Sequence, residues 1–263
     1  MVGIVLFMNF LEIKIDIRRF FPKELLVTSL LTMIVMPVFV YYILGKGFHN
    51  HYRIGLLLIA CAPAGVMTII LGQYINESNY NLVFSNFVFT TFGSILYIPI
   101  VLACILGKTV EIEMQPILRQ TAALIIIPYI ASQIAVKFLR SSRLQWLKNK
   151  SSAVILVLSF FIIMISVASA SSELRWDVSL LDLSARILVI YVLPGGLGYH
   201  AGYLFGGTGT RNTLSFISSS RNVQIVLAIA ILNFPPLTTV PLVIGIFIHH
   251  LVNAFWLWLY RVK

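Results

Sequence analysis

The chain has 263 residues, of which 59% are hydrophobic and only 11% are charged, with a formal net charge of +10. Soluble domains carry roughly 25% charged residues, so this composition excludes an ordinary soluble domain. Several apolar stretches reach ~20 residues, the length at which an α-helix crosses a bilayer. Only helices and closed barrels satisfy their backbone hydrogen bonds in lipid, and the two-residue alternation of barrel strands is absent. The composition predicts an all-α polytopic membrane protein with a single domain over residues 1–263.

Apolar segments follow one another along the chain with short connections, as in a compact bundle. We expect about nine transmembrane segments, at residues 1–13, 24–45, 53–75, 80–106, 115–138, 152–171, 185–206, 213–233 and 237–260. The first is too short to span alone and is expected to continue towards Phe20. No basic region precedes it, so we expect no cleavable signal peptide. The stretch 193–207 carries six glycines, which predict close helix approach.

Lysines and arginines are divided unevenly between alternate loops. Twelve lie in one set of loops, around residues 14–23, 137–150 and 211 and at the C-terminus, and six lie in the other set. Positively charged loops stay in the cytoplasm. We therefore expect a cytoplasmic C-terminus in the plasma or inner membrane and, with nine crossings, an external N-terminus. This role of the positive charge gives no reason to expect a nucleic-acid partner; the expected surroundings are the lipid bilayer.

Two of the apolar segments are interrupted. Segment 53–75 contains Cys61-Ala62-Pro63-Ala64-Gly65, in which proline removes a backbone donor and glycine loosens the helix. Segment 213–233 contains Ser218, Ser219 and Ser220 followed by Arg221 and Asn222. Serine suits a helix cap better than a helix interior, so a new helix N-terminus is expected near 218–220. Paired interruptions in two halves indicate a transporter site at the midplane.

These stretches resemble the bile acid:sodium symporter family, whose superfamily also holds arsenite carriers. "LEIKIDIRRF" is similar to the end of the family's second helix, and "MIVMPVFVYYIL" to its third. "IGLLLIACAPAGVMTIIL" resembles the broken fourth helix and "RNTLSFISSSRNVQIVLAIA" the broken ninth. The resemblance covers nearly the whole chain but lacks the family's first helix. It implies an inverted-repeat transporter fold of ten helices, here reduced to nine, with two discontinuous helices crossing beside a substrate cavity.

The resemblance also implies sodium ligands, and most of the matching positions carry other residues. The Ser-Asn pair after the first break is matched by Thr68 and Ile69, and the glutamate and glutamine around the second break by Ile217 and Arg221. A glutamine on the third helix is matched by Thr32. A sodium ion remains possible by the resemblance, but we expect its sites to be lost.

Two polar positions remain as candidates on that mapping. Asn222 keeps the family's residue, and Asn86 is a candidate polar ligand on the fifth helix. All nine acidic residues fall at or near segment ends, so no carboxylate remains at the midplane for a sodium ion or a coupling proton. An arginine would also repel a sodium ion: two like charges ~4 Å apart repel by about 4 kcal/mol at an effective dielectric constant of ~20.

Arg221 has two compatible interpretations. Its guanidinium group replaces the missing cation by capping carbonyls where the broken helices cross, or it binds an anionic substrate together with the helix N-terminus near 218–220. An arginine at the bilayer centre costs at least ~2.5–3.5 kcal/mol, so a role is expected. The candidate substrate-binding residues are Arg221, Asn222, Ser218, Ser219, Ser220, Pro63, Ala64, Gly65, Thr68, Asn86 and Thr32.

A coupling ion other than sodium is then needed for uptake. A membrane that is negative inside opposes the entry of a monoanion by ~2.3 kcal/mol per 100 mV, so uptake requires an exchange partner or a proton. Histidine titrates near neutral pH. His249 and His250 are therefore the candidate proton-coupling residues, although a histidine near a bundle interior also serves as a hydrogen-bonded packing residue.

The leading hypothesis is a secondary transporter of a small organic anion. An arsenite or metalloid efflux carrier is the alternative within the superfamily, but those carriers depend on a cysteine near the first break, where Ala64 follows Pro63. A non-transporting membrane scaffold is a third reading. No nucleophile–base pair or metal-ligand cluster appears in the apolar segments, so we expect neither an enzyme nor a metal site. No sequence feature indicates an oligomeric state.

Overall fold

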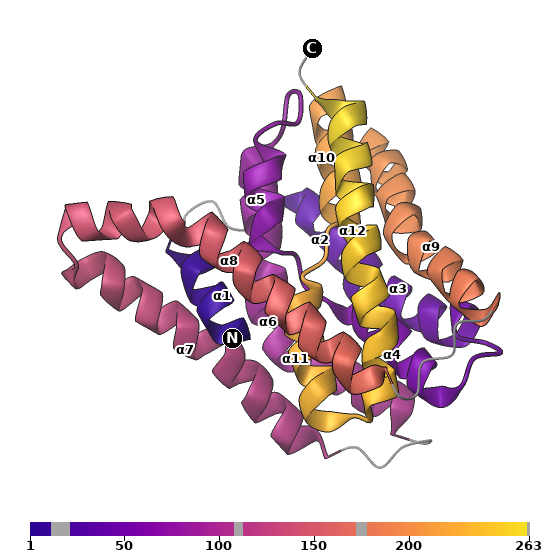
Figure 1. The fold of residues 1–263 in the computed structure, drawn as a ribbon. Helices are drawn as coiled ribbons and strands as arrows, with labels where there is room; N and C mark the ends of the chain where they lie inside the picture. The colour runs from indigo at the N-terminus through magenta and orange to yellow at the C-terminus, as the bar shows by residue number, and fades with distance from the viewer. Residues whose placement is uncertain (12–21, 108–112, 172–177, 262–263) are drawn as a thin grey trace.

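A computed structural model of the protein, shown in Figure 1, describes residues 1–11, 22–107, 113–171 and 178–261. Its elements are α1 (Val2–Phe10), α2 (Lys23–Ser29), η2 (Leu30–Val35), α3 (Met36–Phe39), η3 (Val40–Leu44), α4 (Asn50–Cys61), α5 (Val66–Gly72), α6 (Tyr80–Leu106), α7 (Met114–Phe138), α8 (Ser141–Ala170), α9 (Val178–Ala201), η4 (Gly202–Leu204), α10 (Thr208–Ser219), α11 (Val223–Asn233), η5 (Pro236–Thr238) and α12 (Thr239–Tyr260). Within these ranges every named element is helical, which confirms the all-α prediction.

Within the described ranges, six helical stretches are long and apolar enough to cross a membrane: Lys23–Leu44, Tyr80–Leu106, Met114–Phe138, Leu180–Leu204, Thr208–Asn233 and Pro236–Tyr260. The helix α8 adds a seventh, although it bends by 43° between Ser141–Ser151 and Ala153–Ala168. The protein is therefore a multi-pass membrane protein, as predicted.

Each predicted segment corresponds to a helix, but the described residues contain fewer continuous spans than the nine expected. The helix α1 has 9 residues, about 14 Å at 1.5 Å per residue, which is near half the hydrocarbon thickness. The pair α4–α5 is interrupted. Nine crossings, and with them an external N-terminus, therefore stay a prediction. The expected continuation of the first segment towards Phe20 lies outside the described residues.

The broken pair α10–α11 forms the centre of the bundle. In the most apolar part of Thr208–Asn233, 89% of the residues are buried, against 44% or less in the other five spans. The helix α12 packs on α4, α9 and α11, while α1 lies between α7 and α8, which are joined at the left edge of Figure 1. A helix that is apolar on all sides is stable when surrounded by other helices, and α11 is such a helix. The sequence of α11 therefore accounts for its central position.

The glycines of 193–207 bring α9 against α10, as predicted. A Cβ atom on Gly198 would lie 2.6 Å from the carbonyl oxygen of Leu214, and one on Gly202 would lie 2.7 Å from the Cα atom of Arg211. Real Cβ atoms do not approach backbone this closely, so any side chain at these two positions would push the helices apart. The absence of a side chain fixes the distance between α9 and α10.

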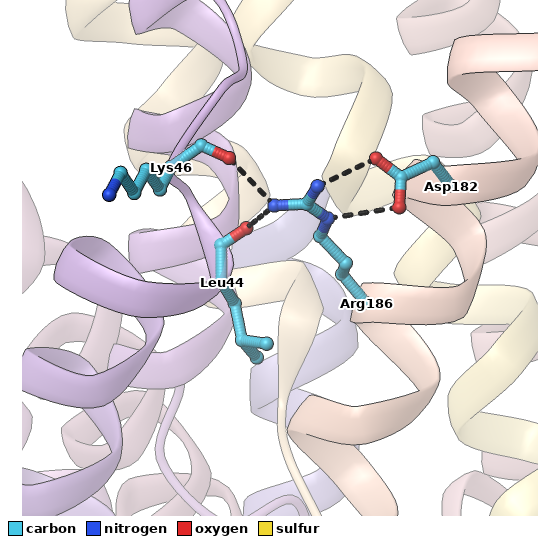
Figure 2. Close-up of polar contacts among 4 residues, drawn as sticks. All are labelled: Leu44, Lys46, Asp182 and Arg186. Carbon is cyan, nitrogen blue, oxygen red and sulfur yellow. Dashed lines mark hydrogen bonds and ion pairs between the residues drawn. The ribbon is translucent and has the colours of Figure 1, made fainter.

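Polar contacts mark the two ends of the bundle. At one end, shown in Figure 2, the guanidinium of Arg186 on α9 pairs with Asp182 and donates from Nη1 to the carbonyl oxygens of Leu44 at 2.7 Å and Lys46 at 2.8 Å. The loop after η3 and the start of α9 therefore lie together.

At the other end, the loop 73–79 is tied to α10 and α12. The backbone N–H of Asn76 donates to the carbonyl of Tyr260 at 2.8 Å, and that of Asn79 donates to the hydroxyl of Thr213 at 3.0 Å. The start of α10 and the end of α12 therefore share the end opposite to Arg186.

Candidate functional site

The breaks in the two interrupted helices lie against each other. The helix α4 ends at Cys61 and α5 begins at Val66, while α10 ends at Ser219 and α11 begins at Val223. The backbone N–H of Asn222 donates to the carbonyl oxygen of Pro63 at 2.5 Å, and Gly65 lies against the side chain of Asn222. The structure thus brings Pro63, Gly65 and Asn222 together, three residues that the sequence placed at one site.

Every carbonyl oxygen from residue 61 to residue 65 accepts a hydrogen bond from another group of the protein. The donors are the Tyr97 hydroxyl to Cys61, Arg221 Nη1 to Ala62 at 3.5 Å, the Asn222 N–H to Pro63, the Thr91 hydroxyl to Ala64 at 3.3 Å and the Thr68 N–H to Gly65 at 3.0 Å. Unpaired backbone groups are costly in a membrane interior. The first break is therefore stable because neighbouring helices supply donors for it.

Arg221 lies in the second break, where its side chain reaches the first break, and it is 4% exposed. Its backbone N–H donates to Nε2 of His249 at 3.1 Å, and its Nη1 reaches the Ala62 carbonyl at the long limit of a hydrogen bond. Nε and Nη2 are buried and have no hydrogen-bond partner among the residues that the structure describes. The only ion pair in the described ranges joins Arg186 and Asp182, so the charge of Arg221 has no carboxylate there.

His249 connects Arg221 to a small polar group on α12. Nε2 of His249 lies 3.0 Å from Nδ2 of Asn253, whose Oδ1 accepts from the Ser220 hydroxyl at 3.3 Å. Because Nε2 accepts the Arg221 N–H, the neutral imidazole carries its proton on Nδ1. The ring of His249 also packs on that of Tyr191 at 5.4 Å between centroids.

The two predicted histidines face different surroundings. His249 is 8% exposed and contacts the break, whereas the neighbouring His250 is exposed on the surface of α12. Consecutive residues of a helix point about 100° apart, so the two rings of this pair point in different directions. The geometry leaves His249 as the histidine of the site.

The predicted helix N-terminus at the serines is wrong. Ser218 and Ser219 are the last residues of α10, Ser220 follows as its C-cap, and α11 begins only at Val223. The hydroxyl of Ser219 donates to the carbonyl of Phe216 at 3.0 Å, while that of Ser218 is buried without a partner. Helix α10 ends later than predicted because the N–H groups of Arg221 and Asn222 bond to His249 on α12 and to the Pro63 carbonyl in the first break.

The candidates Thr32, Asn86 and Thr68 are also buried, and Thr32 and Asn86 lie apart from Arg221. Thr32 donates to the carbonyl of Thr28 at 2.7 Å, and the Thr28 hydroxyl lies 3.5 Å from Oδ1 of Asn86. The carbonyl of Asn86 accepts from Thr90, which in turn accepts the Ala64 N–H. Thr32 and Asn86 thus reach the first break only through other residues, whereas Thr68 contacts it directly through its backbone.

Four contributors were missed in the sequence: Thr90, Thr91 and Tyr97 on α6 and Asn253 on α12. Their spacing carries a signal, because Asn86, Thr90 and Tyr97 share one face of α6 and Asn253 follows His249 by four residues. Polar residues that recur at this helical period in an apolar span mark a buried polar face. The signal lies in the spacing within one helix and not in any local motif.

The model of the sodium bile acid symporter family matches residues 1–175, a range that includes the first break and ends before the second. No curated protein matches the chain.

Proposed function

The chain belongs to the sodium bile acid symporter family, and from this premise we propose that it is a secondary membrane transporter of a small organic anion. The family consists of transporters, which agrees with the expectation that the chain is not an enzyme. The observation that carries the choice of an anion is Arg221, a buried cation with two unpartnered guanidinium nitrogens beside two broken helices.

The chemistry of Arg221 favours a carboxylate or a similar planar anion. A guanidinium presents its donors as a fork that matches a carboxylate in a bidentate contact. A buried charge without a partner is strongly unfavourable, so an anion that bonds to Nε and Nη2 would stabilise the site. Asn222, the next residue in the chain, is also buried, and the buried Ser218 hydroxyl has no hydrogen-bond partner among the described residues.

We propose further that the sodium sites of the family are lost in this chain. Two positions matched to sodium ligands, Ile69 and Ile217, carry buried apolar side chains, and a third carries Arg221. The five carbonyl oxygens of the first break already accept protein donors. Among the described acids, Glu24 is half-buried and the others are exposed, so none supplies a buried negative ligand. These groups do not fit a sodium ion.

His249 is the residue that we propose couples transport to a proton. A proton on its Nε2 would end the bond from the Arg221 N–H, so the charge of this ring and the position of the arginine are linked. A bound anion next to both groups would favour the doubly protonated ring. Anion and proton would then bind together, which removes the electrical barrier of ~2.3 kcal/mol per 100 mV for a monoanion.

The location that we propose is the plasma or inner membrane, with the C-terminus in the cytoplasm. The twelve basic residues of one set of loops support this orientation. The contacts of the C-terminal end of α12 with the loop 73–79 and the start of α10 put these segments on the same side.

Uptake into proteoliposomes tests the transport proposal. The purified chain would be offered radiolabelled taurocholate or pyruvate with a sodium gradient, a proton gradient or neither. We expect uptake of at least one anion without sodium. Strict dependence on sodium would contradict the loss of the sodium sites, and no uptake of any organic anion in a wider panel would contradict the transport proposal.

Variants at Arg221 test the anion site. Hydrogen bonds to a charged group contribute ~1.5–3 kcal/mol, so Arg221→Gln is expected to lower anion affinity by about 10- to 100-fold. Arg221→Lys keeps the charge but loses the fork, and we expect an intermediate affinity. Thermal unfolding of each variant, read by intrinsic fluorescence, is the control for folding. Unchanged uptake by a folded Arg221→Gln protein would show that the arginine has only a structural role.

A further inference from the structure

The connection between α7 and α8 is strongly basic. Residues 137–150, here called the basic segment, contain Lys137, Arg140, Arg143, Lys148 and Lys150, and no acidic residue occurs anywhere from 114 to 171. All five cations are exposed except Lys148, which is half-buried. The segment is therefore a concentrated positive charge without any acid of its own.

The helical part of the basic segment places cations and an aromatic side chain on one face. Arg143, Trp146 and Lys150 are spaced by three and four residues and are all exposed, with Trp146 61% exposed. A neighbouring face carries Leu144 and Leu147, which are half-buried. Residues with this spacing stand above one another on a helix, so the tryptophan lies between two cations.

The orientation of this helix differs from that of the spanning helices. Ser141–Ser151 is bent by 43° from Ala153–Ala168, and Figure 1 shows the first part of α8 running across the direction of α12. The second part of α8 continues into the apolar region of the bundle. The basic segment therefore lies where a spanning helix leaves the hydrocarbon, at the level of the lipid headgroups.

No protein group in the described ranges neutralises these charges. The one ion pair there joins Arg186 and Asp182 at the other end of the bundle. Lys137 lies over the ring of Phe138 at 5.5 Å, a contact that leaves its charge in place. Tryptophan is enriched at the membrane interface, and clusters of four to eight basic residues next to a spanning helix attract acidic lipids.

We propose that the basic segment binds anionic phospholipid headgroups of the adjoining leaflet, with Arg143 and Lys150 contacting the phosphates and Trp146 inserted between the headgroups. Charge complementarity favours an acidic headgroup, and the attachment of the segment to the spanning part of α8 places it in the headgroup layer. A free phosphate ion offers the same chemistry but no apolar surface for Trp146. The proposal is independent of the anion site at Arg221.

The test is lipid binding by the full chain purified in a neutral detergent. Fluorescence anisotropy would follow short-chain fluorescent phosphatidylglycerol and phosphatidylcholine titrated with the protein. We expect phosphatidylglycerol to bind at least about 25-fold more tightly, because Arg143 and Lys150 each contribute about 5-fold in affinity near the surface. Arg143→Gln/Lys150→Gln should then weaken phosphatidylglycerol binding by roughly 25-fold and leave phosphatidylcholine binding unchanged.

Two controls separate this site from general charge and from misfolding. Lys46→Gln/Arg119→Gln removes two exposed cations elsewhere and should leave phosphatidylglycerol affinity unchanged, and Arg143→Lys should retain it. Equal affinity for the two lipids would overturn the proposal, as would an equal loss in the Lys46→Gln/Arg119→Gln protein. Displacement of the lipid by inorganic phosphate at constant ionic strength would show a soluble-anion site instead, and would also overturn it.

Discussion

At the scale of single residues, Arg221 uses only some of its hydrogen-bond donors within the described protein. Its backbone N–H and Nη1 complete the hydrogen bonds of His249 and Ala62, while Nε and Nη2 have no partner. The two interpretations drawn from the sequence, a cap for exposed carbonyls and a ligand for an anion, use different atoms of the same side chain. They are therefore compatible in this geometry.

A substitution at His249 tests proton coupling at this scale. In His249→Gln the amide oxygen still accepts the Arg221 N–H, but the side chain can no longer take up a proton. We expect uptake driven by an anion gradient to persist and its stimulation by an inward proton gradient to disappear. The measurement is uptake into proteoliposomes with the interior buffered at neutral pH and the exterior varied between acidic and neutral values.

The neighbouring histidine provides a matched control for that measurement. His250→Gln changes an exposed side chain on the same helix and should leave the proton response intact. Proton stimulation that survives in His249→Gln would contradict the coupling role. It would leave the proposal that Arg221 binds an anion unaffected.

At the scale of elements, the sequence located both breaks but misplaced the end of one. Pro63 identifies the first break directly, because proline cannot donate within a helix. The second break contains no proline or glycine, and its boundary depends on bonds from 221 and 222 to α12 and to the first break. Local residue preferences favoured an earlier end, at the serines, and tertiary hydrogen bonds decided otherwise.

The packing of α9 on α10 makes a prediction about two nearby glycines. Gly198→Ala would place a Cβ atom 2.6 Å from a backbone oxygen, and we expect it to lower stability by ~1–3 kcal/mol, the typical cost of overpacking. Gly196→Ala meets nothing within 4 Å and is expected to leave stability unchanged or slightly higher. Thermal unfolding in detergent compares the two, and equal melting temperatures would contradict backbone contact between α9 and α10.

At the scale of the whole molecule, the distribution of positive charge predicts which end faces the cytoplasm. Ser142 lies in the basic segment and His49 lies in the loop before α4, and both are exposed. Each can therefore be replaced by cysteine as a site for labelling. We expect a membrane-impermeant maleimide to label His49→Cys in intact cells and Ser142→Cys only after permeabilisation. The protein without either substitution is the control, since it measures the labelling of the native Cys61 and Cys104. The reverse labelling pattern would contradict the proposed orientation.

The sequence by itself determined the helical membrane class, the positions of both interrupted segments and the presence of a central arginine. These follow from local quantities: the length of apolar stretches, the missing N–H of proline and the cost of a charge in lipid. The tertiary structure decided which groups meet at the breaks, because Tyr97, Thr91 and His249 come from helices distant in the chain. It also decided that only one of the two adjacent histidines faces Arg221. Hydrogen bonds between helices depend on packing, and packing is settled only when the whole bundle is assembled.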